Sequence, residues 1–177
     1  MPHRRHVPIF AILGAMVLVT GCGDLLSLHA LYTSQDRVLE SALDGRWEDD
    51  DDPLTVQRAA DGYNVILQSQ KNPSESEKYQ VRLVDIAGVR FADLLPEDQI
   101  GHMFLKVTVT GDQLRVAFFD SEWLRQRVRH EEADIENGRK RAVLTSPTSE
   151  LRRVVAKYAA EPKAYDQGKY VPPRQMS

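Results

Sequence analysis

The chain has 177 residues, and its 23 basic and 26 acidic side chains give a formal net charge of −3. This length suffices for one domain with a proper hydrophobic core. The single cysteine excludes a disulfide within the chain, and the mildly acidic balance argues against nucleic-acid binding, which depends on a basic surface.

Residues 1–21 have the pattern of a secretory signal peptide. Arg4 and Arg5 lie near the start, no acid precedes position 24, and an uncharged run of 11 residues extends over Ile9–Val19. A membrane-spanning helix needs about 20 apolar residues, so this run is too short for an ordinary transmembrane anchor. A basic start, a short apolar core and then small residues predict export and removal of the segment. A buried N-terminal helix is the alternative that we favour less.

The segment ends in Val19-Thr20-Gly21-Cys22, which resembles the lipobox of bacterial lipoproteins: an aliphatic residue and two small residues before a cysteine. In that class the peptide is cut before the cysteine, whose sulfur carries a diacylglycerol and whose amine is usually acylated. The resemblance implies that Cys22 is the lipidated first residue of the mature chain. That chain would keep 156 residues, with 21 basic and 26 acidic side chains and a net charge of −5. Two or three acyl chains form a stable membrane anchor.

Residues 22–33 are predicted to be a lipidated tether that leads to the domain. Four leucines, Leu25, Leu26, Leu28 and Leu31, make this segment more apolar than a usual linker. It therefore either packs on the domain, which we favour, or lies near the lipid surface.

A single β-rich domain is predicted over residues 34–161. It begins with a short helix over 34–43, for which Ser34 is the expected N-cap and Gly45 the stop signal. From Arg46 onward apolar residues recur with a period of two, which is typical of strands. The alternating runs cover positions 54–57, 63–68, 79–83, 89–91, 103–109 and 114–118.

Short turn signals separate these runs, at Asp61-Gly62, Ala87-Gly88 and Gly111-Asp112. Connections of this length favour antiparallel neighbours over crossover units. About seven consecutive strands therefore predict an antiparallel meander that curls into a barrel, a half-barrel or a small sandwich.

Helices are predicted near residues 121–132 and 147–160, so the expected class is mainly β with C-terminal helices (α+β). Asp120 is the expected cap of the first helix, and Ser146-Pro147 forms the start signal of the second. Between them, residues 142–145 are expected to add an eighth strand. Residues 162–177 lack an apolar period and predict a flexible tail.

Three stretches, "LDGRW" at 43–47, "FFDSEWL" at 118–124 and "LTSPTSEL" at 144–151, resemble small uncharacterised bacterial lipoproteins whose mature domain is mostly β. The similarity covers roughly Leu43 to Tyr165. It implies a fold, but it assigns no catalytic residue. Gly45-Arg46-Trp47 also resembles the Gly-x-Trp that opens the first strand of lipocalins.

Trp47 is the residue of the domain that we single out as a possible pocket wall or core plug. It starts the first strand of the series and is followed by an acidic run at 48–52. An indole beside a polar turn is expected to close one end of the sheet, with its N–H near water or a carbonyl group. We favour the core plug.

Two acidic motifs are candidates for metal sites. The five carboxylates at 48–52 suit a hard cation, but they lack the alternating ligands and the glycine of the usual calcium loop, so we favour a solvated hairpin tip. "HEEAD" at 130–134 misses the zinc-protease motif because Asp134 stands where the second histidine belongs. We expect no metal and no cofactor.

His102 and His130 are the candidate general bases of the domain, but neither accompanies a recognisable nucleophile motif, and lipid consumes the thiol of Cys22. Enzymatic activity is therefore the function that we favour least. The basic residues at 125–129 and 139–141 enclose the four acids at 131–136, which cancel much of their charge, so a salt-bridged surface is expected rather than a lipid-binding patch.

The leading expectation is a lipid-anchored binding or interaction module of the bacterial cell envelope. Its expected partners are the membrane, through Cys22, and an envelope protein or a small apolar molecule. A carrier of a small apolar ligand is the first alternative, and an envelope hydrolase is the second. Gly23, rather than aspartate, follows the cysteine, so we expect the periplasmic face of the outer membrane where the cell has one.

Overall fold

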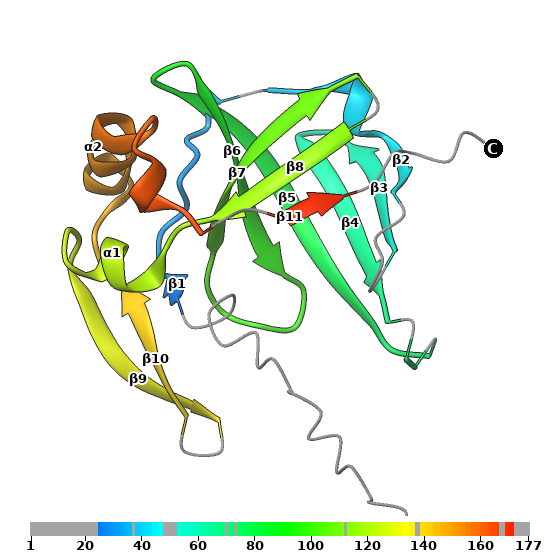
Figure 1. The fold of residues 1–177 in the computed structure, drawn as a ribbon. Helices are drawn as coiled ribbons and strands as arrows, with labels where there is room; N and C mark the ends of the chain where they lie inside the picture. The colour runs from blue at the N-terminus through cyan, green and yellow to red at the C-terminus, as the bar shows by residue number, and fades with distance from the viewer. Residues whose placement is uncertain are drawn as a thin grey trace, which may run out of the picture.

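A large curled antiparallel sheet dominates the computed structural model (Figure 1). The structure describes residues 25–36, 38–47, 53–69, 71–72, 74–111, 113–136, 139–166 and 169–171. The predicted signal peptide (1–21), the lipobox residues Val19, Thr20 and Gly21 with Cys22, and the acidic run at 48–52 lie outside these residues.

The large sheet follows chain order from β2 to β8, and the last strand, β11, lies against β8. Its strands are β2 (Gly45–Trp47), β3 (Leu54–Ala59), β4 (Gly62–Gln68), β5 (Ser76–Ile86), β6 (Val89–Pro96), β7 (Met103–Thr110), β8 (Gln113–Phe118) and β11 (Lys169–Val171). All neighbours are antiparallel, and β2 and β11 form the two ends of the order. The predicted fold class is confirmed: the domain is mainly β and forms a curled half-barrel with a C-terminal helix.

The turn between β5 and β6 shows why the meander keeps its register. Ala87 and Gly88 connect Ile86 to Val89 with φ of 52° and 76°. Two left-handed residues form the hairpin turn whose twist matches that of the flanking strands. This turn fixes the pairing of β5 with β6, the strand that carries Asp93 of the candidate site described below.

A second, three-stranded sheet lies beside the large one and includes the first described strand of the chain. It has the order β1 (Leu25–Ser27), β10 (Arg139–Leu144) and β9 (His130–Glu136), and β1 runs parallel to β10. A bridge between Ser27 and His102 joins it to the start of β7. Helices α1 (Ser121–Arg125) and α2 (Thr148–Tyr158) lie on the same side of the large sheet as this small sheet (Figure 1).

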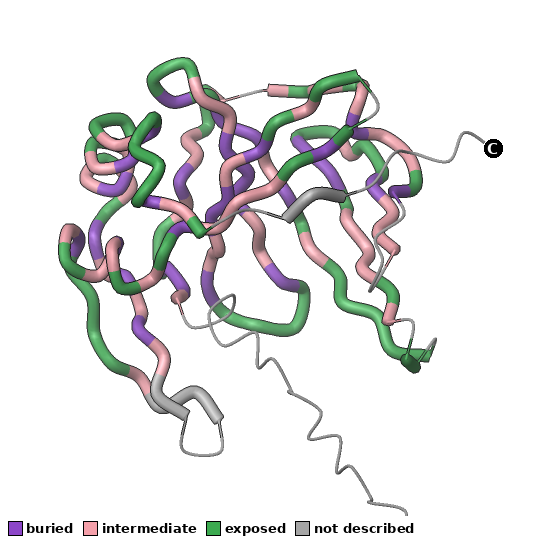
Figure 2. Tube along the Cα trace, viewed as in Figure 1, coloured by how far each residue is buried: buried purple, intermediate pink, exposed green. Residues whose placement is uncertain are grey.

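The central strands are buried on both faces, because the domain has two hydrophobic cores (Figure 2). One core collects side chains from η1 through β8 on the concave face, including Leu43, Trp47, Val56, Tyr63, Val81, Leu83, Ala92, Leu105, Val107 and Leu114. The other fills the space between the opposite face and the helices, with Leu31, Val84, Phe91, Phe104, Phe119, Leu124, Leu144, Leu151 and Val155 among its members. Together they account for the two-sided burial of β5, β6 and β7.

Two predicted helices are wrong in whole or in part. Only a short 3-10 helix, η1 (Ser41–Leu43), forms within 34–43, because Val38 bridges to Leu83 of β5 and so holds the chain extended. The helix predicted at 121–132 ends at Arg125, since β9 begins at His130 and pairs with β10. Helix α2 lies within the predicted range 147–160, although its N-cap is Pro147 rather than Ser146.

The segment at 25–33 packs on the domain, which is the arrangement that we favoured, since β1 is part of a sheet and Leu26 and Leu31 are buried. The predicted C-terminal end of the domain needs correction. The predicted tail contains a second 3-10 helix, η2 (Pro162–Ala164), a bridge from Tyr165 to Phe119, and β11 on the edge of β8. Tyr165 holds the start of this segment against the domain, because its ring packs on that of Phe119 with 4.8 Å between centroids.

Helices of the kind that cross membranes do not occur among the described residues: none is both long and apolar enough.

Candidate functional site

A small pocket lies where the two sheets meet. It is lined by Leu25, Leu26, Ser27, His102, Met103, Phe104, Phe118, Phe119, Leu124 and Leu144. Its volume is about 20 Å³, which is room for about one water molecule. The lining is apolar except for Ser27 and His102, so any chemistry in this pocket depends on these two side chains.

Asp93, which does not itself line the pocket, orients the imidazole of His102. Asp93 is 1% exposed, and its Oδ1 lies 2.6 Å from Nδ1 of His102. Its other oxygen, Oδ2, accepts a hydrogen bond of 2.6 Å from the backbone N–H of Leu31. A carboxylate buried in an apolar core is costly unless it is paired and hydrogen-bonded, and here both oxygens have partners.

The alternation of β6 explains why this carboxylate is buried. Ala92 faces the concave core, so its neighbour Asp93 points to the opposite face, under the N-terminal segment. The strand registers place Asp93 opposite Arg82 of β5 and Phe104 of β7. Asp93 thus belongs to the best-connected part of the sheet, where its position is fixed from both sides.

His102 has one ring nitrogen left for other chemistry. Asp93 occupies Nδ1, so only Nε2 remains to donate or accept a proton. The His102 side chain is 14% exposed and packs edge-on against the ring of Tyr32, with 6.2 Å between centroids. The guanidinium of Arg82 lies 4.9 Å from the centre of that same tyrosine ring. The imidazole is therefore oriented and largely shielded from water.

Ser27 is the natural candidate for a nucleophile beside this histidine, but its hydroxyl is engaged elsewhere. The two residues are bridged through their backbones, with N···O distances of 2.9 and 2.8 Å. The Oγ of Ser27, however, donates to the carbonyl of His29 at 2.7 Å and accepts from the N–H of His29 at 3.2 Å. A serine nucleophile needs its hydroxyl bonded to the base, so this arrangement is not an assembled catalytic triad.

The same contacts do have a clear structural effect, which is to fix the N-terminal segment on the domain. Asp93 binds the N–H of Leu31, and Arg152 of α2 donates to the Leu31 carbonyl at 3.0 Å. Thr148, also of α2, donates to the carbonyl of Ala30 at 2.8 Å. We call Asp93, His102, Thr148 and Arg152 the N-terminal latch.

Asp36 extends the N-terminal latch by binding the same arginine. Nη1 of Arg152 lies 2.8 Å from Oδ2 of Asp36, which also accepts from the N–H of Thr33 at 2.6 Å. Burial by itself would raise the pKa of Asp36, but the hydrogen bonds from Thr33 and Arg152 outweigh it and hold the pKa below its usual value of 3.8. The carboxylate is thus charged, and paired, at neutral pH.

Trp47 is fully buried in the concave core and does not line the pocket described above. Its indole N–H donates to the carbonyl of Leu43 at 2.9 Å. These are the contacts of a core plug at the end of the sheet where η1 meets β2.

His130 and the basic residues make no second site with His102. His130 lies at the exposed start of β9 and is not part of the pocket lining. Arg125 pairs with Glu132, Arg129 pairs with Glu150 at 2.8 Å, and the guanidinium of Arg127 stacks 3.9 Å above the ring of Trp123. Within the described part of the chain, no three histidine, cysteine or acidic side chains lie close enough to hold a metal ion.

Sequence reasoning found His102 but missed its partner. Asp93 interrupts the apolar run "FADLL" at 91–95, and a lone acid in a strand with apolar residues on both sides was the available signal. A central strand buried on both faces does not tolerate an unpaired carboxylate, so such an acid indicates a partner from elsewhere in the chain.

No protein-family model, no curated protein and no solved structure matches the chain.

Proposed function

We propose that this chain is a lipid-anchored binding or interaction module of the bacterial cell envelope. Its signal-peptide pattern and lipobox support export and lipidation at Cys22. The observation that carries the proposal is the fixed position of the segment that follows. Strand β1 begins at Leu25 and is part of a sheet, so a lipid on Cys22 would mount the domain directly on a membrane.

Binding through the outer surface is favoured over transport of an apolar ligand. Pockets for small ligands have volumes of roughly 300 to 1,000 Å³, whereas the pocket beside His102 has about 20 Å³. Trp47 and its neighbours occupy the concave face of the sheet, where a lipocalin-like carrier would hold its ligand. An envelope protein is therefore the partner that we favour, at the periplasmic face of the outer membrane where one is present.

One specific observation supports the hydrolase alternative, namely the bond between Asp93 and His102 at the edge of a pocket. A carboxylate on Nδ1 is how many hydrolases orient a histidine base. The hydroxyl of Ser27 bonds to His29 rather than to His102, so the hydrolase stays the second alternative, after the carrier.

The Cys22→Ser variant tests the lipid anchor. The chain has a single thiol, so this variant is expected to accumulate as an uncleaved precursor that takes up no labelled fatty acid. Leu39→Ser is the matched control, because it introduces the same residue at an exposed position and should leave labelling intact. Normal cleavage and membrane attachment of Cys22→Ser, without label, would overturn the lipoprotein assignment.

The labelled wild-type protein also separates the two binding modes. An interaction module should cross-link to one envelope protein in cells, whereas a carrier should instead co-purify with a stoichiometric apolar molecule. The second result would replace our proposal by the carrier alternative.

A further inference from the structure

Ile100 is the one large apolar side chain that the described part of the domain presents almost entirely to solvent. It is 88% exposed, compared with 53% for Leu28 and 45% for Leu39, the other exposed large apolar residues. Ile100 lies in the loop 97–102 between β6 and β7, and we call these residues the β6–β7 loop. Single exposed apolar residues are common, so exposure alone does not indicate a contact surface. The position of Ile100 in the fold does.

The β6–β7 loop is fixed beside the strand with which the described chain begins. His102, at the end of the loop, exchanges two backbone hydrogen bonds with Ser27 of β1. Gly101 approaches β1 so closely that a Cβ there would lie 3.2 Å from the Cβ of Leu26. Its φ of 117° is one that side-chain-bearing residues rarely adopt, so the loop needs glycine at this point. Ile100 therefore projects from a loop that is hydrogen-bonded to β1 and packed against it.

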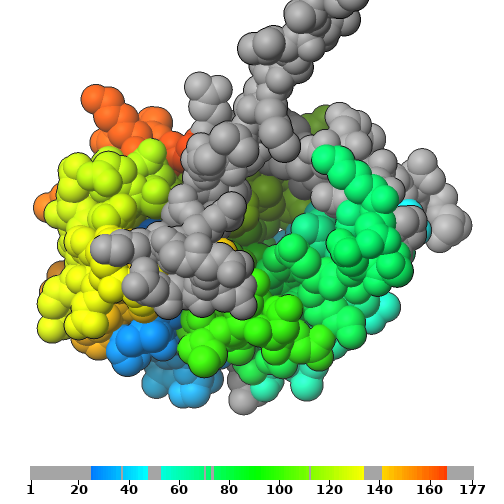
Figure 3. Space-filling view, turned by 90° about the horizontal axis from the view of Figure 1, so that it is seen from below, coloured from blue at the N-terminus to red at the C-terminus, as the bar shows by residue number. Residues whose placement is uncertain are grey.

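The distance along the chain from β1 to the proposed lipid is short. Three residue steps separate Cys22 from Leu25, and a fully extended chain covers at most about 3.6 Å per residue, so the reach is about 11 Å. A lipid on Cys22 consequently holds the start of β1 within about 11 Å of the membrane, whichever path the chain takes. The β6–β7 loop lies at the same end of the molecule as β1 (Figure 3).

We propose that this end of the domain rests on the membrane that holds the lipid, with Ile100 inserted among the lipid headgroups and upper acyl chains. This inference rests on the proposed lipidation of Cys22 and adds to it a defined orientation. The occupant of the apolar tip is then the bilayer itself. Amphipathic helices on membranes bury apolar side chains at the boundary between headgroups and acyl chains, and Ile100 would occupy the same depth.

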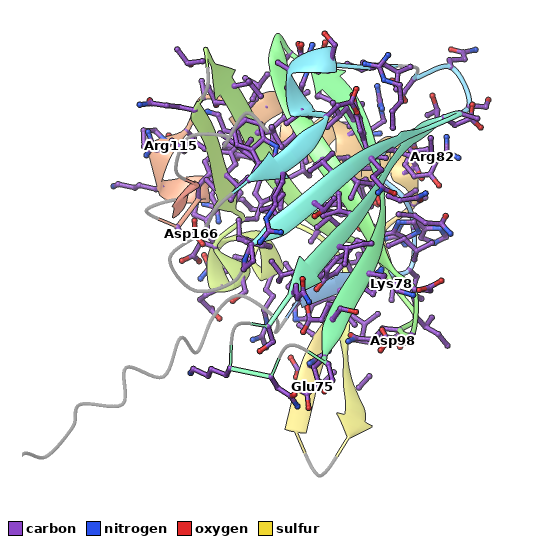
Figure 4. The ribbon with its side chains drawn as sticks, turned by 90° about the vertical axis from the view of Figure 1, so that its right-hand side faces the viewer. Glu75, Lys78, Arg82, Asp98, Arg115 and Asp166 are labelled. Carbon is purple, nitrogen blue, oxygen red and sulfur yellow. The ribbon has the colours of Figure 1, made fainter. Side chains whose placement is uncertain are left out.

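The charges around Ile100 indicate which lipids suit this surface. Glu97 and Asp98 precede it in the loop, and Glu97 pairs with Lys78 at 3.6 Å. Asp98 and Lys78 lie toward the end of the molecule that also carries Glu75 of the β4–β5 hairpin (Figure 4). Arg141 of β10 reaches Gln99 at 3.4 Å. Because two acids precede the tip, we expect insertion into a zwitterionic surface and no requirement for anionic lipid.

Leu39 offers a matched control at the opposite end of the sheet. It precedes Glu40, whose carboxylate bonds to Arg90 at 3.0 Å, and Arg90 lies near the first residue of β6. The β6–β7 loop instead follows the last residue of that strand, Pro96. Leu39 and Ile100 thus lie near opposite ends of β6. Both side chains are exposed enough to label.

The experiment uses Ile100→Cys and Leu39→Cys in the full-length lipoprotein. The native thiol of Cys22 is consumed by lipid, so a thiol-reactive, environment-sensitive fluorophore reports only the new position. Both proteins are reconstituted into phosphatidylcholine vesicles after mass spectrometry has verified their lipidation. We expect blue-shifted emission at position 100 and quenching by aqueous iodide that is about threefold or more weaker than at position 39.

Three results would overturn the orientation. The first is equal quenching at both positions in protein that carries the lipid. The second is protection of position 100 that is equally strong without vesicles, which would indicate that a second copy of the chain covers it. The third is an absence of lipid on Cys22, which would refute the proposed function itself and is recognised by mass before any fluorescence is measured.

Discussion

Replacement of Asp93 by alanine tests whether one buried carboxylate fixes the N-terminal segment on the domain. The substitution leaves the N–H of Leu31 and the Nδ1 of His102, each 2.6 Å from Asp93, without a partner. An unsatisfied buried polar group costs about 1 to 3 kcal/mol, and here two such groups lose their partner. We therefore expect Asp93→Ala to lower the free energy of unfolding by about 2 to 6 kcal/mol.

Asp93→Asn separates the hydrogen bonds from the charge. Its carbonyl oxygen still accepts from Leu31, and its amide donates to Nδ1 if His102 adopts the other neutral tautomer. The loss should then be only about 1 to 2 kcal/mol, since both buried groups keep a partner.

Urea unfolding of the mature chain, followed by circular dichroism, measures both variants. Amide hydrogen exchange adds a local measurement, because the N–H of Leu31 should lose protection in Asp93→Ala and keep most of it in Asp93→Asn. If Asp93→Ala lowers the free energy of unfolding by less than about 1 kcal/mol, or if the amide of Leu31 exchanges as in the wild type, Asp93 does not fix the N-terminal segment.

Two further predictions concern the concave core and the N-terminal latch. Trp47→Ala should destabilise the domain by about 3 to 5 kcal/mol in the same urea assay, because the indole is fully buried. In a Trp123→Phe background, the emission of Trp47 should not shift when fatty acid is added, and a saturable shift would favour the carrier alternative. Asp36 has a lowered pKa in the folded state, so its stabilising contribution is present above its usual pKa of 3.8 and is lost as the pH falls below that value. Asp36→Asn should therefore flatten the loss of stability as the pH falls below 3.8, and an unchanged slope there would contradict the role of its pair with Arg152.

The meander was predictable because its signals are local. Alternation in "YNVIL" and the Ala87-Gly88 turn each depend on a few adjacent residues, and they fix strand, face and register together. The same locality explains why Trp47 could be singled out, since a large indole at a strand start is visible without any knowledge of its partners.

Strand β9 was not predictable in this way. Its exposed acids, Glu131 and Glu132, continue the polar pattern of the preceding helix, and its apolar support comes from the other strand of the hairpin, where Ala142 and Leu144 are buried. A strand that relies on its partner for burial carries little periodicity of its own. Asp93 was missed for a related reason, because its partners Leu31 and His102 lie on other elements and one of them is 62 residues away.

Several of the contacts that hold the first described residues come from late in the chain. Thr148 is 118 residues from Ala30, and Arg152 is 121 residues from Leu31. Such distant contacts form only after most loop-closure entropy has been paid, so the N-terminal segment docks late in folding. While the chain is emerging, that segment has neither β10 nor α2 to pack against. A chain that stops before β10 keeps β2 to β8 of the large sheet but lacks β10, Thr148 and Arg152, so the N-terminal segment retains only its contacts with Asp93 and His102.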